Sequence, residues 1–247
     1  MAKLRWGILS TAAIAKRAFV PGVRNGTEGV VAAVGSRTLE AAQAFATDLQ
    51  IPAVHGSYEA LLADPGIDAV YIGLPNSMHL EWTVKAAQAG KHVLCEKPLA
   101  ASAAEARQMD DACRGAGVHL AEAYMSPFHP VDRRVRALVA GGALGEILAG
   151  RAVFTFPHGD PADHRWGPGG GALLDVGIYC LEPLRAALGD AEPASLAGAA
   201  IAGPGGVDAT FSGWLGYDDG RTATFTAGFD AAEEQRLELI GNVGTLA

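Results

Sequence analysis

Short apolar runs alternate with helical segments throughout the first half of the chain, and this rhythm restricts the fold more than any other feature. Residues 4–9, 30–34 and 69–74 have the composition of buried strands. Further predicted strands are 92–95 and 118–121, and predicted helices are 12–24, 39–49, 78–89 and 103–114. Strands and helices that alternate this often predict a parallel sheet covered on both faces, with right-handed crossovers.

The rhythm changes after residue 122. A helix is expected at 131–140, a long strand at 147–156, and a helix at 172–188 that is entered through a glycine run. Strand-like stretches follow at 195–201, 210–217, 222–228 and 236–240, and residues 217–221 (YDDGR) are typical of a hairpin turn. The second half is therefore predicted to be α+β with a mainly antiparallel sheet, which divides the chain into domains 1–122 and 123–247.

Composition excludes several classes of protein. Hydrophobic residues make up 49% and charged residues 19% of the chain, as in an ordinary globular protein. The net charge is −8 and no dense Lys/Arg cluster occurs, which argues against nucleic-acid binding. The start does not resemble a signal peptide, and no apolar run reaches the ~20 residues of a membrane span. The odd, unpaired set Cys95, Cys113 and Cys180 predicts buried free thiols in a reducing cytoplasm, without disulfides or zinc.

The junction after the first strand is a candidate dinucleotide-binding loop. The usual fingerprint has glycines at positions that are here Ser10, Ala12 and Ala15. Small residues still allow a pyrophosphate to approach the backbone, and a helix N-terminus offers free N–H groups. We assign Ser10, Thr11, Ala12 and Ile14 to cofactor binding; the alternative is a plain capped helix after a strand.

The end of the second strand selects between the two nicotinamide cofactors. An NAD site usually has an acid here that binds the ribose 2′-hydroxyl, but the sequence is Gly35-Ser36-Arg37-Thr38. Arg37 can pair with a 2′-phosphate, and the hydroxyls of Ser36 and Thr38 can donate to the same group. The pattern favours NADP over NAD; the alternative is that Arg37 is a solvated charge at a helix start.

Five segments together resemble one family over essentially the whole chain. They are 74–79 (LPNSMH), 90–99 (GKHVLCEKPL), 122–125 (EAYM), 128–130 (FHP) and 169–179 (GGGALLDVGIY). The chain resembles the glucose–fructose oxidoreductase / inositol dehydrogenase (Gfo/Idh/MocA) family, and most of all its NADP-dependent D-xylose dehydrogenase and dimeric trans-dihydrodiol dehydrogenase branch. The resemblance implies an N-terminal Rossmann domain and a C-terminal α+β domain for substrate binding and dimerisation.

The resemblance also implies hydride transfer between nicotinamide and a hydroxyl-bearing carbon of a sugar, polyol or diol. Lys97, oriented by Glu96, would donate to the substrate oxygen, and Tyr179 would act as general acid/base. A phenol has a pKa near 10, which a nearby cation such as Lys97 lowers. Asp175 lies four residues before Tyr179, so on a helix both side chains would share a face. The alternatives are a surface lysine, a core tyrosine and a carboxylate at a helix start.

Other candidates are less specific. Leu74, Pro75, Asn76 and His79 are assigned to the cofactor, although Asn76 is equally suited to a helix N-cap and His79 to a helix interior. Pro98 is implied to follow a cis bond. Candidates for the substrate wall are His129, His158, His164, Arg165 and Trp166, whereas Phe154 and Phe156 suit a core or a dimer interface. No spacing predicts a metal site.

Three features depart from the family pattern. The fingerprint glycines are missing, Pro127 stands where this branch often has Arg, and the chain is short at its C-terminal end relative to the family. The leading hypothesis is a cytoplasmic, homodimeric NADP-dependent sugar or polyol dehydrogenase, with a dihydrodiol dehydrogenase or carbonyl reductase as the runner-up. The alternative from another class is an NADP(H)-binding regulator, or an inactive shortened homologue, without turnover.

Overall fold

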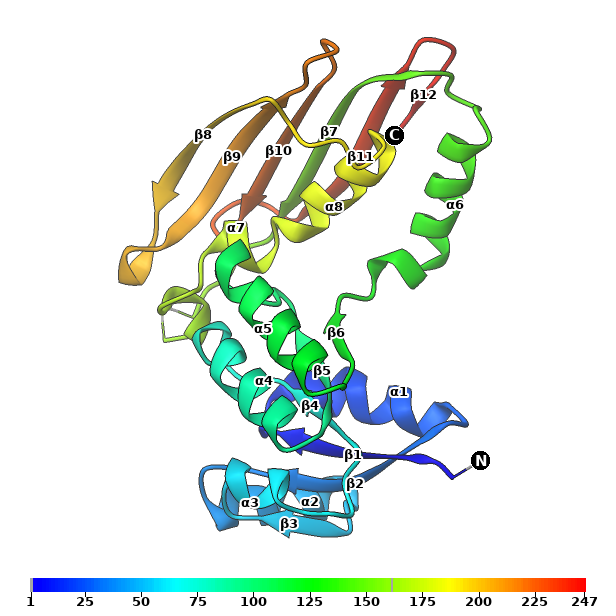
Figure 1. Cartoon of the computed structure of the whole chain (residues 1–247). Helices are drawn as coiled ribbons and strands as arrows, with labels where there is room; N and C mark the ends of the chain where they lie inside the picture. The colour runs from blue at the N-terminus through cyan, green and yellow to red at the C-terminus, as the bar shows by residue number, and fades with distance from the viewer. Residues whose placement is uncertain (1, 161) are drawn as a thin grey trace. The chain divides into compact units, whose positions relative to one another are not determined.

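The computed structural model describes residues 2–160 and 162–247, and it divides the chain into two compact units between Ala123 and Tyr124 (Figure 1). The first unit is built on a six-stranded sheet in which every pair is parallel, with the strand order β3-β2-β1-β4-β5-β6. Its elements are β1 (Leu4–Leu9), η1 (Ala15–Phe19), α1 (Val20–Asn25), β2 (Gly29–Gly35), α2 (Leu39–Leu49), β3 (Ala53–His55), α3 (Tyr58–Leu62), β4 (Ala69–Ile72), η2 (Asn76–Met78), α4 (His79–Gln88), β5 (His92–Glu96), α5 (Ala103–Gly115) and β6 (Leu120–Ala123).

Helices cover both faces of this sheet because its strands carry apolar side chains on both faces. Ile8, Val34 and Tyr71 belong to a core cluster that includes residues of η1, α1 and α2. Leu9 and Val70 belong to a second cluster, which is completed by α3, α4 and α5. All five side chains are at most 1% exposed, so the central strands are anchored on both sides.

Local sequence signals set the helix starts in this unit. The side chains of Thr38, Ser57 and Ser102 accept hydrogen bonds from the backbone N–H groups at the starts of α2, α3 and α5. Such caps satisfy N–H groups that the helix itself leaves unpaired. The caps therefore fix where the chain turns from each loop into a helix.

The second unit is built on another six-stranded sheet, with the order β12-β11-β7-β10-β9-β8. The central pair of β7 and β10 is parallel and the other pairs are antiparallel. Its elements are η3 (Ser126–Phe128), α6 (Pro130–Ala140), β7 (Ile147–Thr155), η4 (His164–Trp166), α7 (Ala172–Asp175), α8 (Ile178–Ala187), β8 (Ser195–Ala202), η5 (Pro204–Gly206), β9 (Asp208–Gly216), β10 (Thr222–Gly228), β11 (Glu234–Gly241) and β12 (Thr245–Leu246).

One face of the second sheet packs against α8. Leu184 of α8 is fully buried, and a Cβ atom added to Gly150 of β7 would lie 2.5 Å from the Leu184 side chain. Cys180, Leu215 and Phe225 belong to the same core cluster. The glycine in β7 thus lets the helix approach the strand closely.

The predicted fold class is confirmed: a parallel Rossmann-type sheet is followed by a mixed, mostly antiparallel one. Three short elements, β3, α3 and β12, were not predicted from the sequence. The single helix expected at 172–188 is wrong, because the chain forms α7 and α8 with a break at Val176 and Gly177. A Cβ atom at Gly177 would lie 2.3 Å from the Leu173 carbonyl oxygen, so the close approach at this break requires glycine.

Candidate active site

The strand order places a switch point between β1 and β4 of the first unit, where connections from neighbouring strands run in opposite directions. In open parallel sheets, ligands bind at the carboxyl ends of strands beside such a point. Ser10 follows β1, Leu74 follows β4 by two residues, and Lys97 follows β5. Residues that are far apart in sequence thus leave the sheet at the same edge.

Ser10 adopts the backbone conformation of a glycine. Its φ is 151°, in a region that L side chains rarely occupy. The side chain is 5% exposed, and its Oγ accepts a hydrogen bond from the Ala12 N–H at 3.3 Å. Glycine, the usual first residue of a dinucleotide fingerprint, adopts a positive φ without strain. Thr11 and Ala12 continue the loop, and Ile14 lies in the helical segment that leads into η1.

The loop after β2 has one buried polar residue, Ser36, and two exposed ones, Arg37 and Thr38. Ser36 is 6% exposed, and its N–H donates to the His55 carbonyl at 3.2 Å. Arg37 is exposed beside α3: burial raises the pKa of the Tyr58 hydroxyl, and the Arg37 charge acts in the opposite direction. The Thr38 Oγ1 accepts from the Ala41 N–H at 3.2 Å as the cap of α2, and its hydroxyl proton can still be donated.

The turn that carries Lys97 is tied to the neighbouring strand through Glu96. The Tyr71 hydroxyl of β4 donates to Glu96 Oε1 at 2.5 Å, and the Lys97 backbone N–H donates to Glu96 Oε2 at 3.2 Å. Burial, followed by the adjacent Glu96 carboxylate, raises the pKa of Tyr71 well above its usual value. Tyr71 therefore remains a neutral donor that fixes the Glu96 carboxylate. The Lys97–Pro98 peptide is cis.

The segment after β4 is connected to this turn by His79, the first residue of α4. One ring nitrogen of His79, Nε2, lies 2.9 Å from the Leu74 carbonyl oxygen, and Nδ1 lies 2.9 Å from that of Pro98. The imidazole is fully buried. Asn76 begins η2 after Pro75 rather than capping α4, whose start has no side-chain cap.

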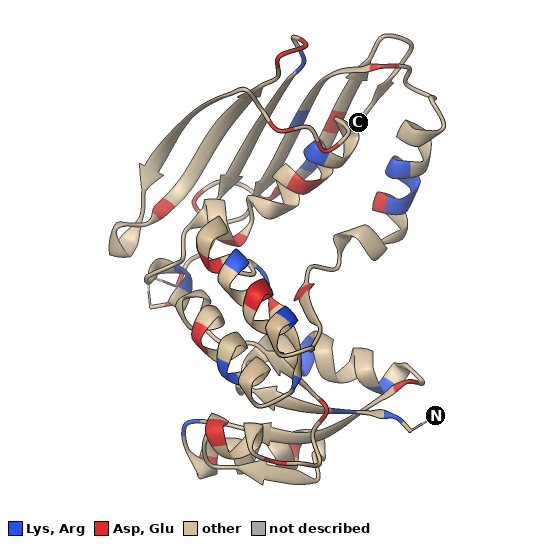
Figure 2. Cartoon of the chain, in the orientation of Figure 1, with Lys and Arg blue, Asp and Glu red and all other residues tan. Residues whose placement is uncertain are grey.

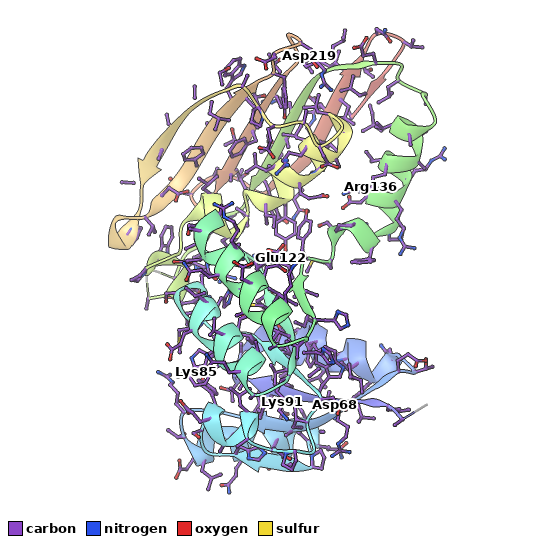
Figure 3. The ribbon with its side chains drawn as sticks, in the orientation of Figure 1. Asp68, Lys85, Lys91, Glu122, Arg136 and Asp219 are labelled. Atoms are coloured by element: carbon purple, nitrogen blue, oxygen red, sulfur yellow. The ribbon has the colours of Figure 1, made fainter. Side chains whose placement is uncertain are left out.

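Glu122 of β6, labelled in Figure 3, is hydrogen-bonded to the same turn. Its Oε1 accepts a hydrogen bond from the Leu99 N–H at 2.8 Å. Burial raises the pKa of Glu122 above its ordinary value, whereas the Leu99 amide, His79 and Lys97 act to lower it. Tyr71 and Glu122 were not singled out from the sequence; a tyrosine inside an apolar strand and an acid at a strand end were the available signals.

In the second unit, Asp175 is held by an arginine that follows a loop. Arg165 Nε donates to Asp175 Oδ2 at 2.9 Å, and Arg165 Nη1 donates to both oxygens of Asp163 at 3.1–3.2 Å. Asp175 is only 9% exposed. A guanidinium at this distance favours the ionised carboxylate. Arg165 was predicted only as part of a substrate wall, and its pairing with Asp175 was not foreseen.

Tyr179 of α8 lies among aromatic side chains. Its hydroxyl donates to the Met125 sulfur at 3.7 Å, and its ring centroid lies 5.4 Å from that of Tyr124 and 5.1 Å from that of Phe154. The expectation that Asp175 and Tyr179 share one helix face is wrong, because the two residues belong to different helices. The Tyr179 N–H bonds to the Val176 carbonyl, because α7 ends at Asp175 and α8 begins after Gly177.

Several residues that were assigned to a substrate wall have structural contacts in the second unit. Trp166 is 7% exposed, and its Nε1 donates to the Asp160 carbonyl. His129 caps α6 through its Nδ1. The His158 ring packs against Trp166 and Phe229, and His164 Nδ1 lies 3.1 Å from an Asp163 oxygen. Phe154 and Phe156 pack on the core of this unit.

Comparison with protein-family models follows the division into two units. The model described as "Oxidoreductase family, NAD-binding Rossmann fold" matches residues 4–124, and the model described as "GFO/IDH/MocA C-terminal domain" matches residues 133–247. The chain belongs to the Gfo/Idh/MocA oxidoreductase family. This Gfo/Idh/MocA protein is therefore an oxidoreductase whose first unit is an NAD(P)-binding Rossmann domain, as the sequence predicted.

Individual relatives of this Gfo/Idh/MocA protein are similar over almost its whole length. It is 44% identical over 235 residues to D-xylose 1-dehydrogenase (NADP(+)) 2 of Haloferax volcanii, a match that covers 94% of this chain and 71% of that protein. It is 36% identical over 245 residues to trans-1,2-dihydrobenzene-1,2-diol dehydrogenase of Xenopus laevis, covering 98% and 74% of the two chains.

Solved structures agree with the fold. The aldose–aldose oxidoreductase of Caulobacter crescentus, crystallised with glycerol, superposes with a TM-score of 0.90 at 31% identity, covering 99% of this chain and 76% of that one. A 3-ketoreductase of Actinomadura kijaniata, crystallised with NADP and TDP-benzene, superposes with a TM-score of 0.88 at 34% identity, covering 99% and 75%.

The described residues contain neither a metal-ligand cluster nor a membrane-spanning helix. No group of three or more His, Cys, Asp and Glu side chains among them could hold a metal ion. Within the same residues, no helix has the length and apolar character needed to cross a membrane. Acidic and basic side chains are interspersed on both units (Figure 2).

Proposed function

We propose that this Gfo/Idh/MocA protein is an NADP-dependent dehydrogenase that transfers hydride between nicotinamide and a hydroxyl-bearing carbon of a sugar, polyol or diol. The observation that carries the proposal is the turn after β5, whose backbone is held by hydrogen bonds of Glu96. This turn carries Lys97 at the same edge of the sheet where the Ser10 loop leaves β1. A fixed cation beside a nucleotide loop suits a reaction in which negative charge develops on a substrate oxygen. The substrate class is supported by the names of the D-xylose and dihydrodiol dehydrogenases that resemble this chain.

NADP is proposed over NAD because the loop after β2 has a cation where an NAD site has an acid. The Arg37 side chain is exposed, and two hydroxyl residues flank it in the sequence. Such a group pairs with a 2′-phosphate and has no comparable partner in NAD. The proposed cofactor-binding residues are Ser10, Thr11, Ala12, Ile14, Ser36, Arg37, Thr38, Leu74, Pro75, Asn76, Glu96 and Lys97, with His79 acting through its contact with Leu74.

Three side chains are proposed to carry out the chemistry. Bound NADP supplies the nicotinamide carbon that accepts a hydride in the oxidative direction. Lys97 donates a hydrogen bond to the substrate oxygen, and Tyr179 accepts the hydroxyl proton as the carbon loses its hydride. Asp175, kept ionised by Arg165, accepts a hydrogen bond from a neighbouring substrate hydroxyl and sets its orientation.

The second unit, residues 123–247 by the sequence division, is proposed to bind substrate and to form a homodimer through the open face of its sheet. Ile201, Trp214 and Ile240 lie on the strand face opposite the one that contacts α8, and they are 60%, 39% and 49% exposed. These three side chains are carried by β8, β9 and β11 of the face that would form the interface. A cytoplasmic location is proposed from the three buried free cysteines.

The test is NADPH formation, followed by near-ultraviolet absorbance, with NADP and a panel of aldoses, polyols and diols. The proposal expects turnover with at least one of these substrates. Lys97→Met and Tyr179→Phe should each reduce kcat by roughly 100-fold or more. Tyr179→Phe should retain NADPH binding, and Lys97→Met should weaken it much less than it lowers kcat. Tight NADPH binding without turnover on any substrate would instead favour a regulator, and unchanged turnover in Lys97→Met would remove this residue from the mechanism.

A further inference from the structure

We propose that His79 and Glu122 hold one peptide group, Pro98–Leu99, between a cation and an anion, and that this clamp positions Lys97. The inference rests on the proposed function only for the role of Lys97. Neither His79 nor Glu122 is proposed to touch the substrate. Both are positioning residues that act through the backbone of the turn after β5.

The first part of the clamp is the environment of the His79 ring. Its Nδ1 lies 2.9 Å from the Pro98 carbonyl oxygen, and its Nε2 lies 2.9 Å from the Leu74 carbonyl oxygen. Carbonyl oxygens only accept hydrogen bonds, and a neutral imidazole has a single N–H. A neutral ring would therefore direct a nitrogen lone pair at one of the two oxygens. Only the imidazolium donates to both.

The burial of the His79 ring strengthens the argument for a doubly protonated imidazole. The His79 side chain is 0% exposed, so water does not replace either contact. A buried polar group without its hydrogen bond costs roughly 1–3 kcal/mol, and a buried charge is retained only where it is paired. The two carbonyl dipoles satisfy the imidazolium directly. The remaining requirement is a counter-charge close to the ring.

Glu122 provides that counter-charge from β6. Its Oε1 accepts from the Leu99 N–H at 2.8 Å. Burial raises the pKa of Glu122, whereas the Leu99 amide and the positive charges of His79 and Lys97 act to lower it. Among the described residues, the charged or titratable groups around this cluster include Cys95 and Glu96 of β5, Lys97 after it, Tyr71 of β4, Cys113 of α5 and Glu122 itself of β6. The cluster thus contains both signs of charge.

The two contacts meet on a single peptide group. The Pro98 carbonyl and the Leu99 N–H belong to the same planar unit and point in opposite directions, because only the preceding peptide is cis. The cation binds the oxygen end of this dipole and the anion binds its N–H end. Both interactions strengthen as the peptide polarises. Lys97 precedes this unit directly, so the clamp restricts the path of the backbone that presents the ammonium group.

The protonation of His79 tests the clamp without any substrate. Protein labelled with 15N in its histidine rings is compared with a His79→Gln variant by NMR near neutral pH, and His119→Gln, an exposed histidine before β6, serves as the matched control. The clamp predicts that both ring nitrogens of one histidine carry slowly exchanging protons. Their signals should disappear in His79→Gln and remain in His119→Gln. One protonated and one unprotonated ring nitrogen at His79 would overturn it.

Kinetics test the positioning role. Glu122→Gln keeps an oxygen acceptor for the Leu99 N–H and removes only the charge, and His79→Gln removes one of the two donors. Each should lower kcat roughly 10- to 100-fold and shift KM for the substrate much less, since a small misplacement of a catalytic group has this effect. The double variant should lose no more than the worse single variant, because both residues act on one peptide. Multiplied losses, or losses in thermal stability alone, would contradict the role. If NMR shows the His79 imidazolium but neither variant changes kcat, the hydrogen bonds of the clamp are correct and the catalytic role proposed for Lys97 is wrong.

Discussion

The strained backbone at Ser10 allows a stability prediction that compares two substitutions at one position. Ser10→Gly and Ser10→Ala both remove the Oγ contact with the Ala12 N–H, so this loss cancels in the comparison. Alanine keeps a Cβ atom at a φ of 151°, whereas glycine does not. Relief of such strain is worth about 1–3 kcal/mol, and the greater freedom of glycine in the unfolded chain costs about 0.4–1 kcal/mol.

The mid-range values of these terms, about 2 and about 0.7 kcal/mol, predict that Ser10→Gly is more stable than Ser10→Ala by about 1.3 kcal/mol. At an unstrained position the order would be reversed, because alanine is ordinarily the more stabilising residue. Thermal unfolding followed by circular dichroism should place the glycine variant above the alanine variant by roughly 2–8 °C. NADPH binding to the glycine variant should be retained, since its loop keeps the same backbone path. An alanine variant as stable as the glycine variant would refute the assigned backbone conformation.

Three further predictions concern the cofactor, the second core and the thiols. Arg37→Ala should weaken NADPH binding roughly 10- to 100-fold and NADH binding much less, by fluorescence titration; equal losses would exclude a phosphate contact. Leu184→Ala should lower stability by about 3 kcal/mol and Tm by roughly 6–12 °C, because this fully buried side chain leaves a cavity against Gly150; a Tm within the error of the wild type would contradict this packing. Burial raises the pKa of Cys180 to about 12, so this thiol should resist alkylation in the native protein and react on unfolding. Between its ordinary pKa and about 12, the Cys180 thiol ionises only in the unfolded protein. The stability that the neutral buried thiol contributes should therefore be lost as pH rises through this range. Cys180→Ala should make stability less dependent on pH over the same range.

Elements with strong local signals were predictable from the sequence. The apolar run of β1 and the Ala-rich segment of α2 were assigned with their observed bounds, Leu4–Leu9 and Leu39–Leu49. β3 has only three residues, too few to show a period, and was missed. The break between α7 and α8 was also missed, because an isolated Gly177 in a helical pattern does not reveal that its backbone must approach Leu173.

The sequence supplied candidate site residues but did not reveal the contacts that these residues make. Lys97 and Asp175 were identified by their motifs, which are local in sequence. The partner of Asp175 is Arg165, on the other side of a glycine-rich loop, and the contacts of His79 and Glu122 depend on neighbouring strands. Tertiary geometry of this kind leaves no period or spacing in the sequence, so only the structure reveals it.

Transfer of deuterium tests the central claim most directly. Aldoses deuterated at C1, and diols deuterated at their carbinol carbons, are incubated with NADP and the wild-type protein, and the reduced cofactor is analysed by mass spectrometry. Direct hydride transfer from the substrate carbon predicts NADPH that carries one deuterium, formed by the wild type and almost absent with Tyr179→Phe. Reduced cofactor without deuterium, or none formed from any substrate of the panel, would contradict the account.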